Sequence, residues 1–89
     1  MKRNPDFLLR QVAGKQVVVP VGRAAGKFSG MLTLNETSVY LWELLEQEQT
    51  IQSLAQALCE RYEVSWETAV ADAERFANEL LPVGAIIEE

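Results

Sequence analysis

The chain has 89 residues with no histidine and a single cysteine, Cys59. Histidine is the commonest metal ligand and acid–base side chain, and one cysteine provides neither a metal cluster nor a cysteine–histidine pair. The glycines at 22, 26 and 30 match neither the Walker nor the dinucleotide-binding spacing. We therefore expect no catalytic residue, no metal site and no cofactor, and a protein that is not an enzyme.

Long apolar runs are also missing. No stretch approaches the roughly 20 residues that a membrane-spanning helix needs, and no signal peptide is recognisable before the first apolar segment. The lone cysteine allows no disulfide framework within the chain, which fits a reducing compartment. We expect one domain over residues 1–89, located in the cytoplasm and without a membrane partner.

Positive charge is scarce in the second part of the chain. Residues 35–89 carry twelve acids against only two basic residues, Arg61 and Arg75, whereas residues 1–34 carry six basic residues against Asp6 alone. Such a split can steer a charged partner, and it can equally just keep a small domain soluble.

What is present is a set of short apolar segments followed by longer amphipathic ones. FLLRQV (7–12) and QVVVPV (16–21), separated by AGK with Gly14 as the turn residue, predict a β-hairpin. Residues 22–30 contain three glycines and predict a loop. MLTL (31–34) predicts a third strand, which leads without a loop into a helical pattern.

Asn35, Thr50 and Ser65 each precede an apolar pattern of helical spacing and predict three helix N-termini. The residues expected to face the core are Ser38, Leu41, Trp42 and Leu45, then Ile51, Leu54, Ala55, Leu58 and Tyr62, then Trp66, Ala69, Val70, Ala73, Phe76, Ala77 and Leu80. Pro82 and Gly84 end the third helix, and AIIEE is expected as a short strand or a tail. The order predicts an α+β winged helix-turn-helix fold, a three-stranded antiparallel sheet followed by three helices.

A helix-turn-helix beside a hairpin is also found in proteins that bind nucleic acid, so we ask whether this chain could bind DNA. The recognition helix would span residues 66–81, where Glu67, Asp72, Glu74 and Glu79 face Arg75 alone. Binding to duplex DNA depends largely on lysine and arginine neutralising phosphates. We therefore expect no DNA partner, and keep a winged-helix nucleic-acid-binding or transcription-related module as the alternative.

Two segments, FSGMLTLNETSVYLWELL and TIQSLAQALCERYEVSWETAVADAERFANELLPVGAI, resemble the pyrroloquinoline-quinone biosynthesis protein D (PqqD-like) family over most of the chain. The matching positions are Leu34-Asn35, Leu41-Trp42 and Leu44-Leu45, then Thr50, Leu54, Leu58 and Tyr62, then Asp72, Phe76, Leu80 and Gly84. The departures are Ser29, where relatives often have asparagine, and Ala73 and Ala77, where larger apolar residues are common.

The resemblance implies a recognition element for ribosomally made, modified peptides (a RiPP recognition element). Such a peptide chaperone holds the leader of a precursor peptide and presents it to a modifying enzyme, often a radical SAM enzyme. In the family, the leader adds as a strand beside the third strand and against the third helix. The residues that would bind the peptide here are Met31, Leu32, Thr33 and Leu34 in the strand and Asp72, Arg75, Phe76 and Glu79 in the helix.

The residues themselves are consistent with that mode, because an edge strand offers unpaired N–H and C=O groups to an extended peptide. Arg75 would pair either with a leader carboxylate or, within its helix, with Glu79. Two further readings remain. The same edge can pair with its own copy in a homodimer, and the domain can be a structural fragment of a larger modifying enzyme.

Overall fold

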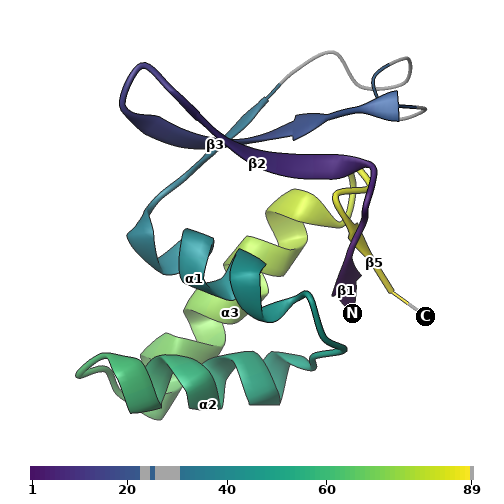
Figure 1. The fold of residues 1–89 in the computed structure, drawn as a ribbon. Helices are drawn as coiled ribbons and strands as arrows, with labels where there is room; N and C mark the ends of the chain where they lie inside the picture. The colour runs from purple at the N-terminus through teal and green to yellow at the C-terminus, as the bar shows by residue number, and fades with distance from the viewer. Residues whose placement is uncertain (23–24, 26–30, 89) are drawn as a thin grey trace.

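The computed structural model describes residues 1–22, 25 and 31–88, and the chain folds as strands followed by helices (Figure 1). The elements are β1 (Lys2–Arg3), β2 (Phe7–Val12), β3 (Lys15–Pro20), β4 (Leu32–Leu34), α1 (Glu36–Leu44), α2 (Ile51–Arg61), α3 (Trp66–Leu80) and β5 (Ile86–Ile87). The predicted α+β arrangement of a three-stranded antiparallel sheet followed by three helices is confirmed. The loop expected at residues 22–30 lies, apart from residues 22 and 25, outside the described residues.

Strands β2, β3 and β4 lie side by side in that order, and both pairings are antiparallel. The hairpin is tighter than the sequence suggested, because Lys15 already pairs with Val12 instead of belonging to the turn. The two turn residues, Ala13 and Gly14, have φ values of 51° and 80°. Positive φ at both central positions is typical of a type I′ turn, whose twist matches that of the flanking strands.

All three predicted helix N-caps are confirmed. Asn35 accepts a hydrogen bond from the backbone N–H of Ser38 at 2.8 Å, and Ser65 accepts one from Thr68 at 3.2 Å. Thr50 forms a reciprocal capping box with Ser53. Each cap satisfies a backbone donor that the first helical turn leaves unpaired, so these short polar side chains fix where the helices begin.

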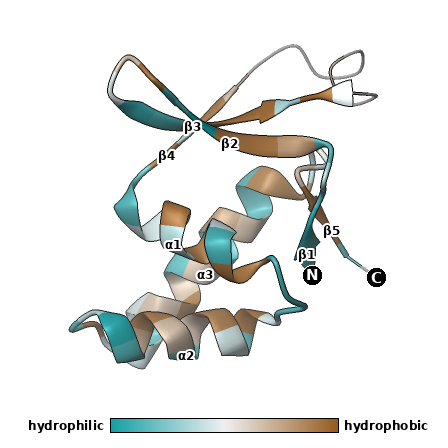
Figure 2. Ribbon diagram, in the orientation of Figure 1, coloured by the Kyte–Doolittle hydropathy of each residue, from teal (hydrophilic) through white to brown (hydrophobic). Residues whose placement is uncertain are grey.

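The core lies between the helices and the inner face of the sheet, and Figure 2 shows hydrophobic residues on both. Its largest fully buried side chains are Trp42, Leu41, Leu45, Leu54, Leu58, Leu80 and Val18. Most of the predicted stripe residues are buried here, whereas Ser38, Ile51, Tyr62 and Val70 are half-buried.

Trp66 was predicted as a core residue, and this prediction is wrong, because 50% of its surface is exposed. It is the first residue of α3, whereas Ala69, one turn later, is fully buried. Helical periodicity gives the direction of a side chain around the axis but not how far along the axis a neighbour covers it.

A second, two-stranded sheet joins the two ends of the described chain, and the sequence did not predict its first strand. Lys2 pairs with Ile87 and Arg3 with Ile86 in antiparallel register. The short strand considered at 85–89 is thus present as β5, and Met1 joins the core with 8% exposure. Within the described residues, no helix has the length and apolar character that crossing a bilayer would require.

Candidate peptide-binding edge

Strand β4 lies at the edge of the three-stranded sheet. It pairs with β3 on one side, and no other described strand pairs with it on the other. Leu34 is followed directly by Asn35, the N-cap of α1, so no loop separates the strand from the helix. A sheet edge presents backbone N–H and C=O groups that an extended peptide can pair with.

A cavity of about 390 Å³ opens beside this edge, and residues of β4, α1 and α3 line it. Its lining consists of Thr33, Leu34, Asn35, Thr37, Ser38, Leu41, Asp72, Arg75, Phe76 and Glu79. We call this cavity the edge groove. Six of the eight residues singled out from the sequence therefore meet in one place, although they come from segments about 40 residues apart in the chain.

The other two singled-out residues lie outside the lining of the edge groove. Met31 precedes β4 and is 57% exposed, and Leu32 is half-buried and pairs with Val18 of β3. Their backbone continues the line of the edge, but their side chains do not shape the groove.

The groove has an apolar part and a charged part. Leu34 and Phe76 are 7% and 3% exposed and form an apolar base, which Leu41 extends from α1. Asp72, Arg75 and Glu79 come from α3 and supply the charged side. Seven of the ten lining residues are polar or charged, so a partner would contact mainly polar side chains above this apolar base.

Arg75 forms an ion pair with Asp72, three residues before it. The alternative from the sequence, a pair with Glu79, is not formed. The Arg75 side chain is 68% exposed. Exposed ion pairs contribute only about 0–1 kcal/mol, because water and salt screen them. The guanidinium can therefore exchange Asp72 for a carboxylate of a partner at little cost.

Sequence reasoning missed the contribution of α1, namely Asn35, Thr37, Ser38 and Leu41. The signal was available, since a helix capped by the residue next to a strand must begin beside that strand. In the described part of the chain, no three histidine, cysteine, aspartate or glutamate side chains gather in an arrangement that could hold a metal ion.

The comparisons with known proteins agree with this fold. The family model described as "Coenzyme PQQ synthesis protein D (PqqD)" matches residues 15–86. This range includes β4, α1 and α3, and the chain belongs to this family.

Among solved structures, "TbiB1 in Complex with the TbiA(beta) Leader Peptide" is similar, with a TM-score of 0.76 and 18% sequence identity. The match covers 100% of this chain and 98% of that one, so the two proteins share their fold. No curated protein matches the chain.

Proposed function

We propose that this protein is a peptide chaperone without catalytic activity of its own. It binds the leader of a ribosomally synthesised precursor peptide along the free edge of β4 and presents the remainder to a modifying enzyme. The observation that carries the proposal is the edge groove, which is lined by α3 and by the edge of β4 that pairs with no other described strand. Membership of the PqqD family supports it, as does the fold shared with a protein solved with its leader peptide.

Strand addition explains both the affinity and the selectivity of such binding. The leader backbone pairs with Leu32, Thr33 and Leu34, while every second leader side chain points toward the edge groove. An apolar leader side chain fits the base formed by Leu34 and Phe76. The charged residues of the groove select among leaders by charge. Arg75 favours a leader with an acidic side chain nearby, whereas Asp72 and Glu79 favour one with a basic side chain.

The partner that receives the presented peptide is a radical SAM enzyme or another modifying enzyme. The protein works as one domain in the cytoplasm and needs no cofactor, because the enzyme supplies the chemistry. A homodimer formed through two β4 edges would occupy the same backbone groups as the leader, so self-association and leader binding compete in this proposal.

The test is titration of the ¹⁵N-labelled protein with the leader of a precursor peptide identified among the neighbouring genes, followed by a scan of leaders N-methylated at one position each. N-methylation removes one backbone donor of the peptide and leaves the protein untouched. Strand addition predicts weaker binding at alternate leader positions, with a period of about two residues. Amide shifts should concentrate on β4, the start of α1 and the groove side of α3.

Two results would overturn the proposal. The first is a leader that binds with no alternation in the N-methylation scan, because a docked helix or an irregular segment would produce that. The second is absence of leader binding combined with saturable binding of a DNA duplex at physiological salt. The second result would favour the winged-helix nucleic-acid reading instead.

A further inference from the structure

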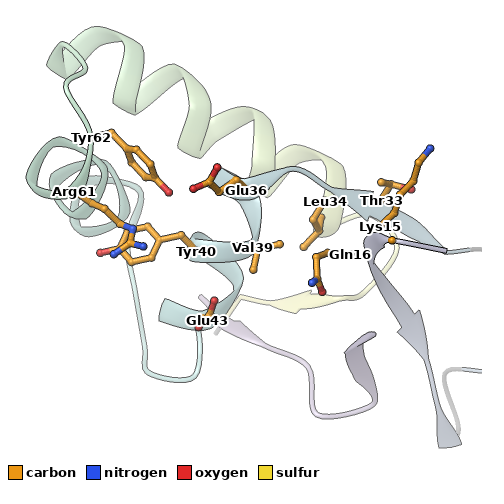
Figure 3. Close-up of a pocket in the computed structure, with 11 residues that line it drawn as sticks. Lys15, Gln16, Thr33, Leu34, Glu36, Val39, Tyr40, Glu43, Arg61 and Tyr62 are labelled. Atoms are coloured by element: carbon orange, nitrogen blue, oxygen red, sulfur yellow. The ribbon is translucent and has the colours of Figure 1, made fainter. Parts of the chain in front are cut away.

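A larger cavity, of about 700 Å³, lies on the side of β4 that pairs with β3. It is lined by Gly14, Lys15, Gln16, Thr33, Leu34, Glu36, Val39, Tyr40, Glu43, Arg61 and Tyr62 (Figure 3). We call it the α1–α2 pocket. Only Thr33 and Leu34 also belong to the lining of the edge groove, so both cavities can be occupied at the same time.

The end of this pocket near α2 is an aromatic wall that carries one cation. The rings of Tyr40 and Tyr62 meet edge to face, with centroids 6.1 Å apart. The guanidinium of Arg61 lies 4.8 Å from the Tyr40 ring centroid and 5.8 Å from that of Tyr62. Cation–π contacts hold Arg61 against the two rings, which keeps its charge at this end of the pocket.

The hydroxyl of Tyr62 is buried and makes no hydrogen bond with any described residue. It raises the pKa of Arg61 above its ordinary value, as a nearby acceptor does, and Tyr40 and Glu36 add to the effect. Arg61 and the hydroxyl nevertheless fall short of hydrogen-bond geometry, and no other described group bonds to the hydroxyl. A buried hydroxyl usually has a partner, and leaving it without one costs stability.

Two carboxylates on α1 also line this pocket. Glu36, Tyr40 and Glu43 are spaced i, i+4 and i+7 and share one face of the helix, with the two glutamates roughly 10 Å apart along the axis. Neither glutamate forms an ion pair with any described residue. Both are exposed, and Val39 and Leu34 give the pocket an apolar base beside them.

The charge that faces the pocket favours a cationic partner. Lys15 belongs to the lining, but its side chain is directed away from the two glutamates (Figure 3), so Arg61 is the cation that opposes them. The pocket lies between the acidic helical part, with twelve acids against two arginines in residues 35–89, and the basic hairpin part, with six basic residues against Asp6 in residues 1–34. Glu36 and Glu43 attract a basic side chain of a partner and repel an acidic one.

We infer that the α1–α2 pocket is a docking site for a second protein, and that it takes a lysine or arginine side chain flanked by an apolar residue. The cation lies between Glu36 and Glu43, the apolar residue contacts Val39 and Tyr40, and a polar group of the partner bonds to the Tyr62 hydroxyl. The inference rests on the proposed function, in which the second protein is the peptide-modifying enzyme. The leader occupies one side of β4 and the enzyme binds the other.

The test compares the binding of a peptide-modifying enzyme, identified among the neighbouring genes, to four forms of the full chain. The first variant, Glu36→Gln/Glu43→Gln, should weaken binding by about tenfold at low salt and reduce its dependence on ionic strength. The matched control is Glu67→Gln/Glu74→Gln, which removes a first-turn acid and a mid-helix acid from exposed positions of α3 and should bind like the unchanged protein.

The second variant, Tyr62→Phe, removes only the unpartnered hydroxyl. It should weaken enzyme binding by about three- to tenfold, the range for one hydrogen bond. Its melting temperature should not fall, because the hydroxyl makes no hydrogen bond with the described residues. A purely structural role of Tyr62 would give the opposite pattern, with lower stability and unchanged binding.

Leader affinity and oligomeric state are measured on the same variants to identify the occupant. The inference holds if the pocket variants weaken enzyme binding and leave leader affinity and the monomer–dimer equilibrium unchanged. It is overturned if they bind the enzyme as tightly as the control or more tightly, if leader affinity falls instead, or if only self-association changes. If the unchanged protein does not bind the leader at all, the proposed function is refuted, independently of the result for the pocket.

Discussion

Truncation of Leu41 to alanine tests how much the packing of this side chain stabilises the core and the edge groove. Leu41 is 1% exposed and lies where α1 meets the sheet and α3. The substitution removes three carbon atoms, a loss of about 2.4 kcal/mol in transfer free energy at about 0.8 kcal/mol per carbon. If the surroundings do not collapse into the space, the cavity adds on the order of 2 kcal/mol. We expect a loss of about 2.4–4.5 kcal/mol in the free energy of unfolding.

That loss is large for a chain of this size. With 89 residues, a stability of roughly 0.05–0.15 kcal/mol per residue gives about 4–13 kcal/mol in total. The melting temperature should fall by roughly 10–35 °C, at about 4–8 °C per kcal/mol for a domain of this length.

Urea unfolding followed by far-ultraviolet circular dichroism measures the effect, with Leu8→Ala as the matched control. Leu8 undergoes the same chemical change but is 39% exposed on the outer face of β2, so its loss should stay below about 1 kcal/mol. If the two variants differed by less than about 1 kcal/mol, Leu41 would not be the packing centre described here.

Two further substitutions test the helix start and the exposed tryptophan. Asn35→Ala removes the acceptor of the Ser38 N–H and should cost about 1 kcal/mol in thermal unfolding, whereas Asn35→Asp should retain most of the stability; equal melting temperatures for both would contradict the capping role. Trp66→Ala should change stability by less than about 1 kcal/mol and Trp42→Ala by about 3–5 kcal/mol, because their exposed fractions are 50% and 2%. A reversal of that order would show that Trp66 is covered in solution.

The parts of this fold that the sequence predicted are those that depend on neighbours in the chain. Asn35, Thr50 and Ser65 bond to a backbone N–H three residues later, so the cap and its partner lie within one short segment. The α1 side of the edge groove was missed, although the adjacent residues Leu34 and Asn35 tie the strand to α1 and could have predicted it. The family resemblance then supplied α3 as the opposite wall, which no local pattern could do.

The parts that the sequence did not predict depend on distant packing. Lys2 and Ile87 pair across almost the whole chain, and strands of two residues are too short to show any periodicity. The contact of Tyr40 with Arg61 and Tyr62 depends on how α1 and α2 are set against each other. In the sequence these residues look like an ordinary helix face and a helix end, and only the fold brings them together.

Thr33 and Leu34 line both the edge groove and the α1–α2 pocket, so a shift of these two residues would change the shape of both sites. If a leader that orders these two residues favours the docking-competent shape of the pocket, enzyme docking must tighten leader binding by the same factor. A coupling of only about 1–3 kcal/mol would already change either affinity by about 5- to 150-fold. The short strand would then do more than hold a peptide, because it would let the enzyme distinguish a loaded chaperone from an empty one.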